Sequence, residues 1–114
     1  MRWRKTERQQ MILETLEAIV LEVTHIDANY YSTHRLANRE EIVTVRRIVS
    51  HIASDRMWIG NQVIGDFFKK DRASVLYYIK TCQDFIDVDP FFAKMYREAR
   101  EKFNAKLAEI GDNY

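Results

Sequence analysis

The chain has 114 residues and a formal net charge of +1, a length that suits one domain with a single core and is too short for two ordinary domains. Hydrophobic residues make up 46% and charged residues 31%, which is typical of a globular chain and excludes a disordered one. Only three Gly and one Pro are present, too few for the turns of a β protein. We therefore expect an all-α domain.

Several function classes find no support in the sequence. The single Cys excludes an internal disulfide and a thiol-based zinc site, and the three His lie on separate segments without metal-ligand spacing. There is no Gly-rich phosphate loop, nucleophile elbow or paired-carboxylate arrangement. No apolar run approaches the ~20 residues that span a bilayer, and the basic N-terminus lacks the apolar core of a signal peptide. We expect a cytoplasmic protein that is not an enzyme, binds no cofactor or metal and has no membrane partner.

Apolar residues at helical spacing predict the first two long helices. The first is expected over 4–24, and the next long one runs to about residue 55, with a helical turn and a loop between them. Asn38 is placed to cap the second of these helices, and Asn61 to cap a short helix that follows. The Met-Trp pair at 57–58 is predicted to form a hydrophobic plug between helices.

Residues 64–80, which read IGDFFKKDRASVLYYIK, are the most informative part of the chain. A short apolar helix ends in the polar break 69–71, and a second helix begins with Arg72 and Ser74 near its exposed N-terminus. The inner face of this second helix is predicted to hold Val75, Leu76 and Ile79. This order is typical of a helix-turn-helix, whose second helix offers its N-terminal turn to the DNA major groove.

The cluster at the start of that second helix has two interpretations. As a DNA-binding site, its Lys and Arg side chains bind phosphates, while Arg72 and Ser74 reach base edges. As an ordinary solvated turn, it is simply capped by Asp71. The residues concerned are Lys69, Lys70, Asp71, Arg72 and Ser74.

Four arginines, Arg35, Arg39, Arg46 and Arg47, flank or begin the helix that ends near residue 55. They can bind phosphates, and one from the preceding loop can enter a minor groove. Alternatively, Arg46 and Arg47 only pair with acidic neighbours. The charge is segregated along the chain, with a basic segment at 1–10, an acidic one at 11–34 and a basic one at 35–60.

Adjacent aromatic pairs occur at 30–31, 67–68 and 77–78. They can act as stacking platforms for single-stranded nucleic acid. Because only one member of an adjacent pair can face inward on a helix, we favour core packing with a half-exposed partner.

Asp89 and Pro90 predict the start of a last helix, which runs to about residue 110 and ends at Gly111. Its apolar stripe is long for a small domain. We expect Phe91, Phe92 and Met95 to pack on the core, and Phe103 and Leu107 to pack on a second copy in a homodimer. The alternative is a helix folded wholly against its own domain.

The segment Ile64–Leu76 resembles one family. Domain IV of the bacterial replication initiator DnaA, a DNA-binding domain with a Trp-repressor-like helical fold, contains Ile-Gly-x-x-Phe-Gly-Gly-Arg-Asp-His-Thr-Thr-Val-Leu. This chain has Ile64-Gly65-Asp66-Phe67-Phe68, then Lys69-Lys70-Asp71-Arg72-Ala73-Ser74, then Val75-Leu76. The similarity covers roughly residues 12–86 and is specific at 64–76. The loop is one residue shorter here, and lysine replaces the Gly-Gly.

The resemblance implies a set of DNA-binding residues. Asp71, Arg72, Ala73 and Ser74 stand where the family's Asp-His-Thr-Thr reads bases and phosphates, so the exchanged residues should change the sequence recognised. Arg46 matches an arginine that touches the DNA backbone, and Arg35 or Arg39 matches one that enters the minor groove. Asn61 and Gln62 match the start of the bracing helix, whose backbone N–H groups approach phosphate.

The sequence therefore predicts a single domain of about six helices. It would comprise an N-terminal helix and loop at 1–33, a helix-turn-helix core at 34–86 and a C-terminal helix at 87–114. We expect it to bind double-stranded DNA with some sequence preference, in replication or transcription control and without the family's ATPase module. The alternative is a helical protein–protein interaction module that keeps the fold but does not bind DNA.

Overall fold

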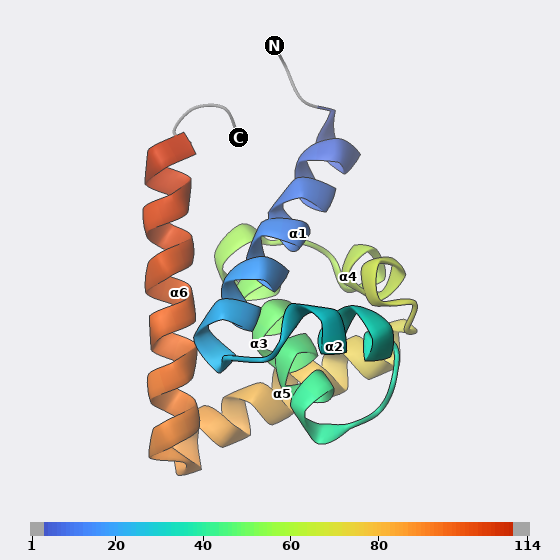
Figure 1. The fold of residues 1–114 in the computed structure, drawn as a ribbon. Coiled ribbons are helices and arrows are strands. Elements are labelled where there is room, and N and C mark those ends of the chain that lie inside the picture. Colours follow the sequence, from blue (N-terminus) through green and yellow to red (C-terminus); the bar gives the residue numbers. More distant parts are fainter. Residues whose placement is uncertain (1–3, 111–114) are drawn as a thin grey trace.

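The computed structural model describes residues 4–110, which form six helices and no strand (Figure 1). The helices are α1 (Lys5–Thr24), α2 (Ala28–His34), α3 (Glu40–Met57), α4 (Asn61–Phe68), α5 (Arg72–Val88) and α6 (Pro90–Ile110). The predicted all-α domain of about six helices is confirmed. Gly111, expected to end the last helix, lies outside the described residues.

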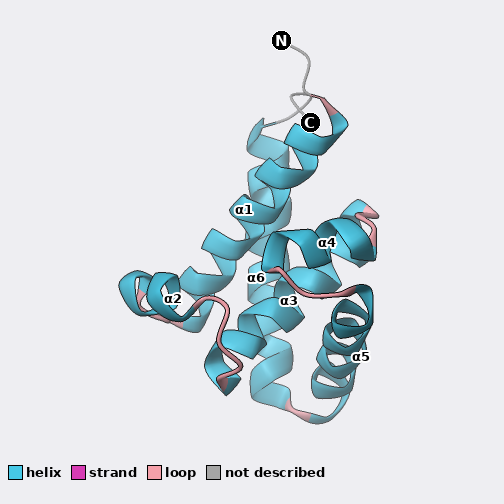
Figure 2. Ribbon diagram, turned by 90° about the vertical axis from the view of Figure 1, so that its right-hand side faces the viewer, coloured by secondary structure: helices cyan, strands magenta, loops and turns pink. Residues whose placement is uncertain are grey.

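Helix α3 is the centre of the domain. Almost every residue from Ile42 to Ala53 is buried, as expected for a helix that is surrounded by others. It packs against α1, α4 and α5, and α6 covers α1 and α5 on the outside (Figure 2). Each fully buried aliphatic side chain of α3 contributes about 1.5–3 kcal/mol to the stability of the fold. Helix α3 therefore anchors the elements that carry the candidate site.

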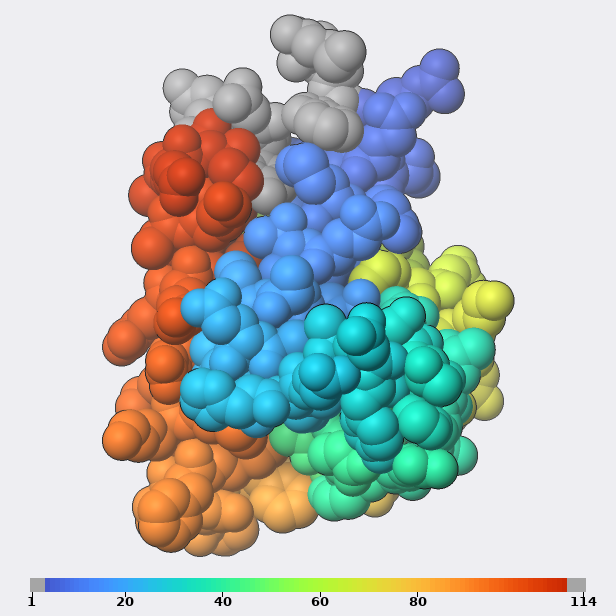
Figure 3. All heavy atoms as spheres, in the orientation of Figure 1, coloured from blue at the N-terminus to red at the C-terminus, as the bar shows by residue number. Residues whose placement is uncertain are grey.

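Helices α1 and α6 pack side by side along one edge of the molecule (Figure 3). The apolar stripe predicted for α1 is confirmed, since Ile12, Leu16 and Val20 are buried. The face that α6 turns inward follows steps of four, three and four residues and consists of Phe92, Tyr96, Ala99 and Phe103.

The side chains of α6 correct two expectations. Phe103 is fully buried in its own domain, so it cannot form the predicted contact with a second copy. Phe91, predicted to pack on the core, is 85% exposed, because it lies about 100° around the helix from Phe92. Leu107 is partly buried against the same core. The alternative interpretation of this helix, packing against its own domain, describes the observed face.

Two predicted helix starts are confirmed by their hydrogen bonds. The Asp71 carboxylate accepts a hydrogen bond from the Ser74 backbone N–H at 2.8 Å and caps α5. The Asp89 carboxylate accepts from the backbone N–H groups of Phe91 and Phe92 at 3.0 and 3.2 Å. Pro90, which has no N–H to satisfy, follows as the first residue of α6.

Two other predicted caps are wrong. Arg39 holds the N-cap position of α3 without a side-chain cap, because the Asn38 side chain instead accepts hydrogen bonds from residues of α3 and of the turn before α5. Gly60 holds the N-cap position of α4, and Asn61 is the first helical residue. Asn38 therefore lies one residue before the N-cap position of α3, and Asn61 lies one residue after that of α4.

The predicted hydrophobic plug at 57–58 is only half right. Met57 ends α3 and packs partly against the core, whereas Trp58 is 87% exposed. The backbone of Trp58 is left-handed, with φ 56°, and this reversal turns the next residue, Ile59, into the core instead. Ile59 is buried and fills the space expected for the indole.

Candidate nucleic-acid interface

The turn between α4 and α5 is closed by a Schellman motif. The backbone N–H of Lys69 donates to the Asp66 carbonyl at 3.4 Å, and that of Lys70 donates to the Gly65 carbonyl at 2.8 Å. Lys69 is left-handed, with φ 55°. A Cβ added at Gly65 would lie 2.4 Å from the Lys70 carbonyl oxygen, so only glycine fits there. The α4–turn–α5 arrangement fits a helix-turn-helix.

The first turn of α5 presents its polar residues to solvent. Lys69, Arg72 and Ala73 are exposed, and Lys70 and Ser74 are partly exposed. The hydrogen bond from the Ser74 backbone N–H holds the pKa of the Asp71 carboxyl below its usual value. Three cationic side chains thus surround the start of a helix, where the backbone N–H groups also favour an anion.

The orientation of α5 differs from the prediction at Leu76. The helix turns Val75, Tyr78 and Cys82 towards the core, whereas Leu76 is 55% exposed and Tyr77 is 57% exposed. The buried residues follow one another at steps of three and then four residues, and Leu76 lies outside this face. Burial of the Cys82 thiol raises its pKa to about 12, which makes it an unreactive structural side chain.

Tyr77 lines the hollow of the candidate site and is not among the residues that the sequence predicts for it. The expectation that one member of each aromatic pair is buried is confirmed at Tyr31, Phe68 and Tyr78. That pattern indicated an exposed tyrosine at 77–78 without deciding which one. The exposed face of α5 includes Ala73, Leu76, Tyr77 and Lys80. Leu76 and Tyr77 form the apolar middle of this stripe, and Lys80 places a cation at its far end.

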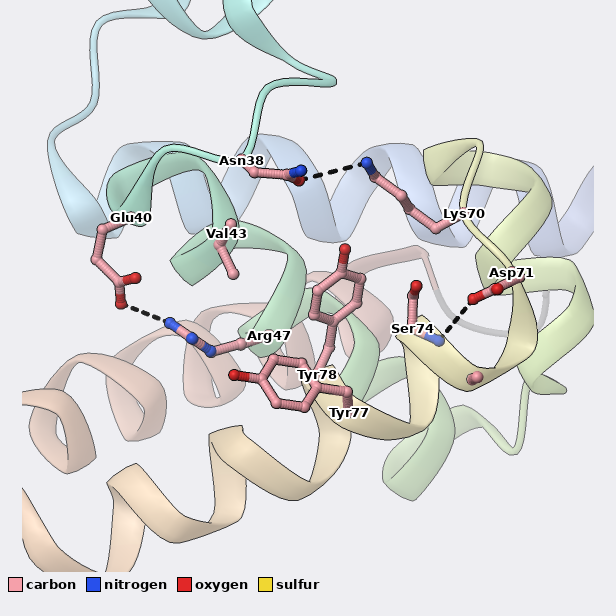
Figure 4. A pocket seen from close by; sticks show the side chains of 10 residues that line it. Asn38, Glu40, Val43, Arg47, Lys70, Asp71, Ser74, Tyr77 and Tyr78 are labelled. Atoms are coloured by element: carbon pink, nitrogen blue, oxygen red, sulfur yellow. Dashed lines mark hydrogen bonds and ion pairs between the residues drawn. The ribbon is translucent and has the colours of Figure 1, made fainter.

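A shallow hollow of about 570 Å³ lies between the start of α5 and the start of α3 (Figure 4). It is lined by Asn38, Glu40, Val43, Arg47, Lys70, Asp71, Ala73, Ser74, Tyr77 and Tyr78. Its charges are largely compensated within it. Arg47 is buried and pairs with Glu40 at 2.6 Å, and it also donates to the Thr81 hydroxyl at 3.0 Å. The hollow is therefore nearly neutral, because its charged lining consists of the cations Arg47 and Lys70 and the carboxylates Glu40 and Asp71.

Arg46, predicted to touch the DNA backbone, lies inside the fold. Its side chain is fully buried and donates to the backbone carbonyls of Arg35 and Ala37 at 3.0 and 2.6 Å, and to the Asn38 side chain at 3.2 Å. Its guanidinium holds the loop between α2 and α3 in place. A buried group cannot reach a phosphate, so Arg46 is not part of the interface.

The two candidate minor-groove arginines differ in the burial and in the partners of their side chains. Arg35 is half-buried, pairs with Glu17 at 2.8 Å and donates to the Phe67 carbonyl at 3.1 Å. Arg39 is exposed and donates to the Tyr30 hydroxyl at 3.1 Å. That hydrogen bond raises the pKa of the Arg39 guanidinium. Arg39 therefore presents more of its side chain to solvent than Arg35 does. It follows Asn38 in the chain, and the Asn38 side chain contacts the turn before α5.

Asn61 and Gln62 occupy the first turn of α4, as the resemblance implied. Gln62 is exposed and donates to the Asp66 carboxylate at 2.9 Å. The helix has no side-chain cap, so its first N–H groups are open to an acceptor. The structure therefore gathers the residues of 69–74 with Asn38 near the turn, whereas the Arg39 side chain contacts Tyr30 on α2. Residues 61–62 lie at the far end of α4, and Arg35 and Arg46 have structural roles.

Other kinds of site find no support in the part of the chain that the structure describes. Residues 4–110 contain no group of three or more His, Cys, Asp or Glu side chains that would hold a metal ion. None of the helices within this range is long and apolar enough to cross a membrane. Comparisons with protein-family models, with curated proteins and with solved structures each find no significant match.

Proposed function

We propose that this chain binds double-stranded DNA through the α4–turn–α5 unit. The observation that carries the proposal is the exposed first turn of α5, where Lys69, Lys70 and Arg72 surround a helix N-terminus on a rigid turn. The opposite face of α5 is packed against α3, so the exposed face is fixed relative to the rest of the domain. A rigid helix with a cationic first turn suits insertion into a major groove.

The residues divide into two roles under this proposal. Lys69 and Lys70 on the turn, with Lys80 further along α5, bind phosphates and position the domain. Arg72 reaches base edges, where an arginine side chain recognises guanine. Arg39 is the remaining minor-groove candidate. The three lysine–phosphate contacts predict a log–log salt slope of about −3, at roughly −0.9 for each phosphate neutralised.

The experiment that tests the proposal is selection of bound sequences from a random duplex pool, followed by affinity measurements at several salt concentrations. Arg72→Ala should weaken binding by about 1–3 kcal/mol and relax the sequence preference. Lys70→Ala should weaken all sequences about equally and flatten the salt slope by roughly one unit. Lys94→Ala, on α6, is the matched control and should change neither. No binding to any duplex at low salt would overturn the proposal.

A second candidate function is a helical protein–protein interaction module. The observation that favours it is the apolar middle of the exposed α5 stripe, where Leu76 and Tyr77 lie beside a nearly neutral hollow. One measurement, the salt dependence of duplex binding, distinguishes the two candidate functions. Duplex binding with a steep salt dependence supports the first, because apolar docking releases no counterions.

A further inference from the structure

Trp58 is the most exposed of the large hydrophobic side chains among the described residues. Its position is set by its backbone: the left-handed φ of 56° places it at the end of α3, and its N–H donates to the Ser54 carbonyl at 3.1 Å. The next residue, Ile59, is buried and fixes the chain on the other side. The backbone that carries this large flat indole is thus fixed, and the ring faces solvent, where it can stack on another ring.

A hollow of about 260 Å³ adjoins this indole, between the first turns of α1 and the α3–α4 junction. Its lining consists of Lys5, Arg8, Gln9, Ile12, Met57, Trp58 and Ile59. The two charged residues in this lining are both basic. Within residues 4–110, no ion pair joins Lys5 or Arg8 to a carboxylate. The nearest acidic neighbour in sequence, Glu7, pairs with Arg4 instead, at 3.8 Å.

The geometry points to a binding site for single-stranded nucleic acid formed by Trp58, Lys5 and Arg8. An exposed aromatic face beside cations is the combination that binds unpaired strands, since bases stack on the ring and phosphates bind the cations. Paired bases inside a duplex do not present their faces. The eight residues of α4, about 12 Å long, separate this hollow from the turn before α5. Trp58, Lys5 and Arg8 are therefore not among the side chains assigned to the duplex interface, whose cationic turn lies at the other end of α4.

The test uses the tryptophan itself as the probe. The chain has two Trp residues, so Trp3→Phe leaves Trp58 as the only indole. Titration with a twelve-nucleotide oligothymidylate at low salt should quench its fluorescence. In the otherwise unchanged chain, Trp58→Leu should weaken binding of this strand about 5- to 160-fold, the effect of one lost base–aromatic stack. Trp58→Phe should retain most of the affinity.

The cationic half of the site has its own readout. The double variant Lys5→Gln, Arg8→Gln should flatten the salt slope for the single strand by roughly 1.4 units, about 0.7 for each contact. The double variant Lys94→Gln, Arg97→Gln removes the same charge from exposed positions on α6 and should leave the slope unchanged. Circular dichroism checks that each variant is folded.

Two outcomes would overturn this site. One is equal affinity of wild type and Trp58→Leu for the single strand. The other is equal quenching by a twelve-residue polyglutamate, which would assign the hollow to anions in general. Failure here is separable from failure of the duplex proposal, because Trp58→Leu should leave blunt duplex binding unchanged. Arg72→Ala, conversely, should leave binding of the single strand unchanged.

Discussion

Arg46 and Lys70 donate to the same acceptor, the side-chain oxygen of Asn38, at 3.2 and 3.4 Å. One donor is fully buried and the other lies on the turn before α5. The shared oxygen therefore joins the α2–α3 loop to the candidate DNA-binding turn at the surface, above the buried Arg46 guanidinium.

Arg46→Met should destabilise the domain by about 1–3 kcal/mol, because it removes a charged donor from two backbone carbonyls and an amide. The measurement is the free energy of unfolding in urea, together with amide hydrogen exchange of the loop. Arg56→Met is the matched control: Arg56 is exposed and donates to Asn104 at 3.1 Å, so its loss should cost less than about 0.5 kcal/mol. Equal costs for the two variants would refute the structural role of Arg46.

Gly65→Ala should destabilise the domain by about 1–3 kcal/mol, the usual cost of overpacking. The added Cβ would meet the backbone oxygen of Lys70 at 2.4 Å, and backbone cannot move aside as a side chain can. The same shift of the turn should weaken DNA binding. Gly60→Ala is the control, since nothing lies within 4 Å of a Cβ there. The free energy of unfolding in urea is measured for both variants. A Gly65→Ala variant as stable as wild type would contradict the prediction.

Lys69 should show opposite effects on stability and on binding. Lys69→Gly relieves the left-handed conformation of the turn and should stabilise the domain by about 1 kcal/mol. Because it also removes a cation, it should weaken binding to every duplex. Lys69→Ala removes the same charge but keeps the strained backbone, so it should weaken binding without the gain in stability. Thermal unfolding and DNA titration of both variants test the separation.

The cap at Asp71 predicts a pH dependence. Its pKa is lower in the folded chain than its ordinary value of 3.8, because the carboxylate accepts from the Ser74 backbone N–H. The stability that it contributes is therefore present above that ordinary pKa and is lost as the pH falls through the folded pKa. Asp71→Asn keeps a capping oxygen that does not titrate. Its unfolding midpoint should fall less steeply below pH 4 than that of wild type, and parallel curves would contradict the prediction.

Phe103→Glu should act on folding rather than on oligomeric state. Phe103 is fully buried, so a carboxylate there should cost more than about 3 kcal/mol. Phe91→Glu, at an exposed position on the same helix, should leave stability within about 0.5 kcal/mol. Urea unfolding and light scattering distinguish the cases. A stable Phe103→Glu variant whose mass falls from dimer to monomer would restore the original dimer hypothesis.

The fold was largely predictable because helical periodicity and capping are local properties. The stripe of α1 and the caps Asp71 and Asp89 required only neighbouring residues. The errors arose where a choice between adjacent residues depended on tertiary packing. Leu76 and Tyr78 fit the inner face of α5 about equally well by spacing, and contact with α3 selected the tyrosine.

The candidate site was less predictable than the fold. Its cluster at 69–74 is contiguous in sequence and could be found by inspection. The structural roles of Arg35 and Arg46 could not be predicted from the sequence. An arginine that donates to backbone carbonyls of a folded loop has the same sequence pattern as one that faces DNA. The Met-Trp pair at 57–58 predicts a hydrophobic plug between helices, and only the reversed backbone at the end of α3 shows that Trp58 faces outward.

The buried guanidinium of Arg46 has a consequence for acid conditions. Its hydrogen-bonding partners are two carbonyl oxygens and an amide oxygen, none of which gains a proton in the range where proteins fold. Ion pairs such as Arg47–Glu40 lose their attraction once the carboxylate is protonated. The contacts that Arg46 makes with the α2–α3 loop should therefore persist during acidification until α3 itself unfolds.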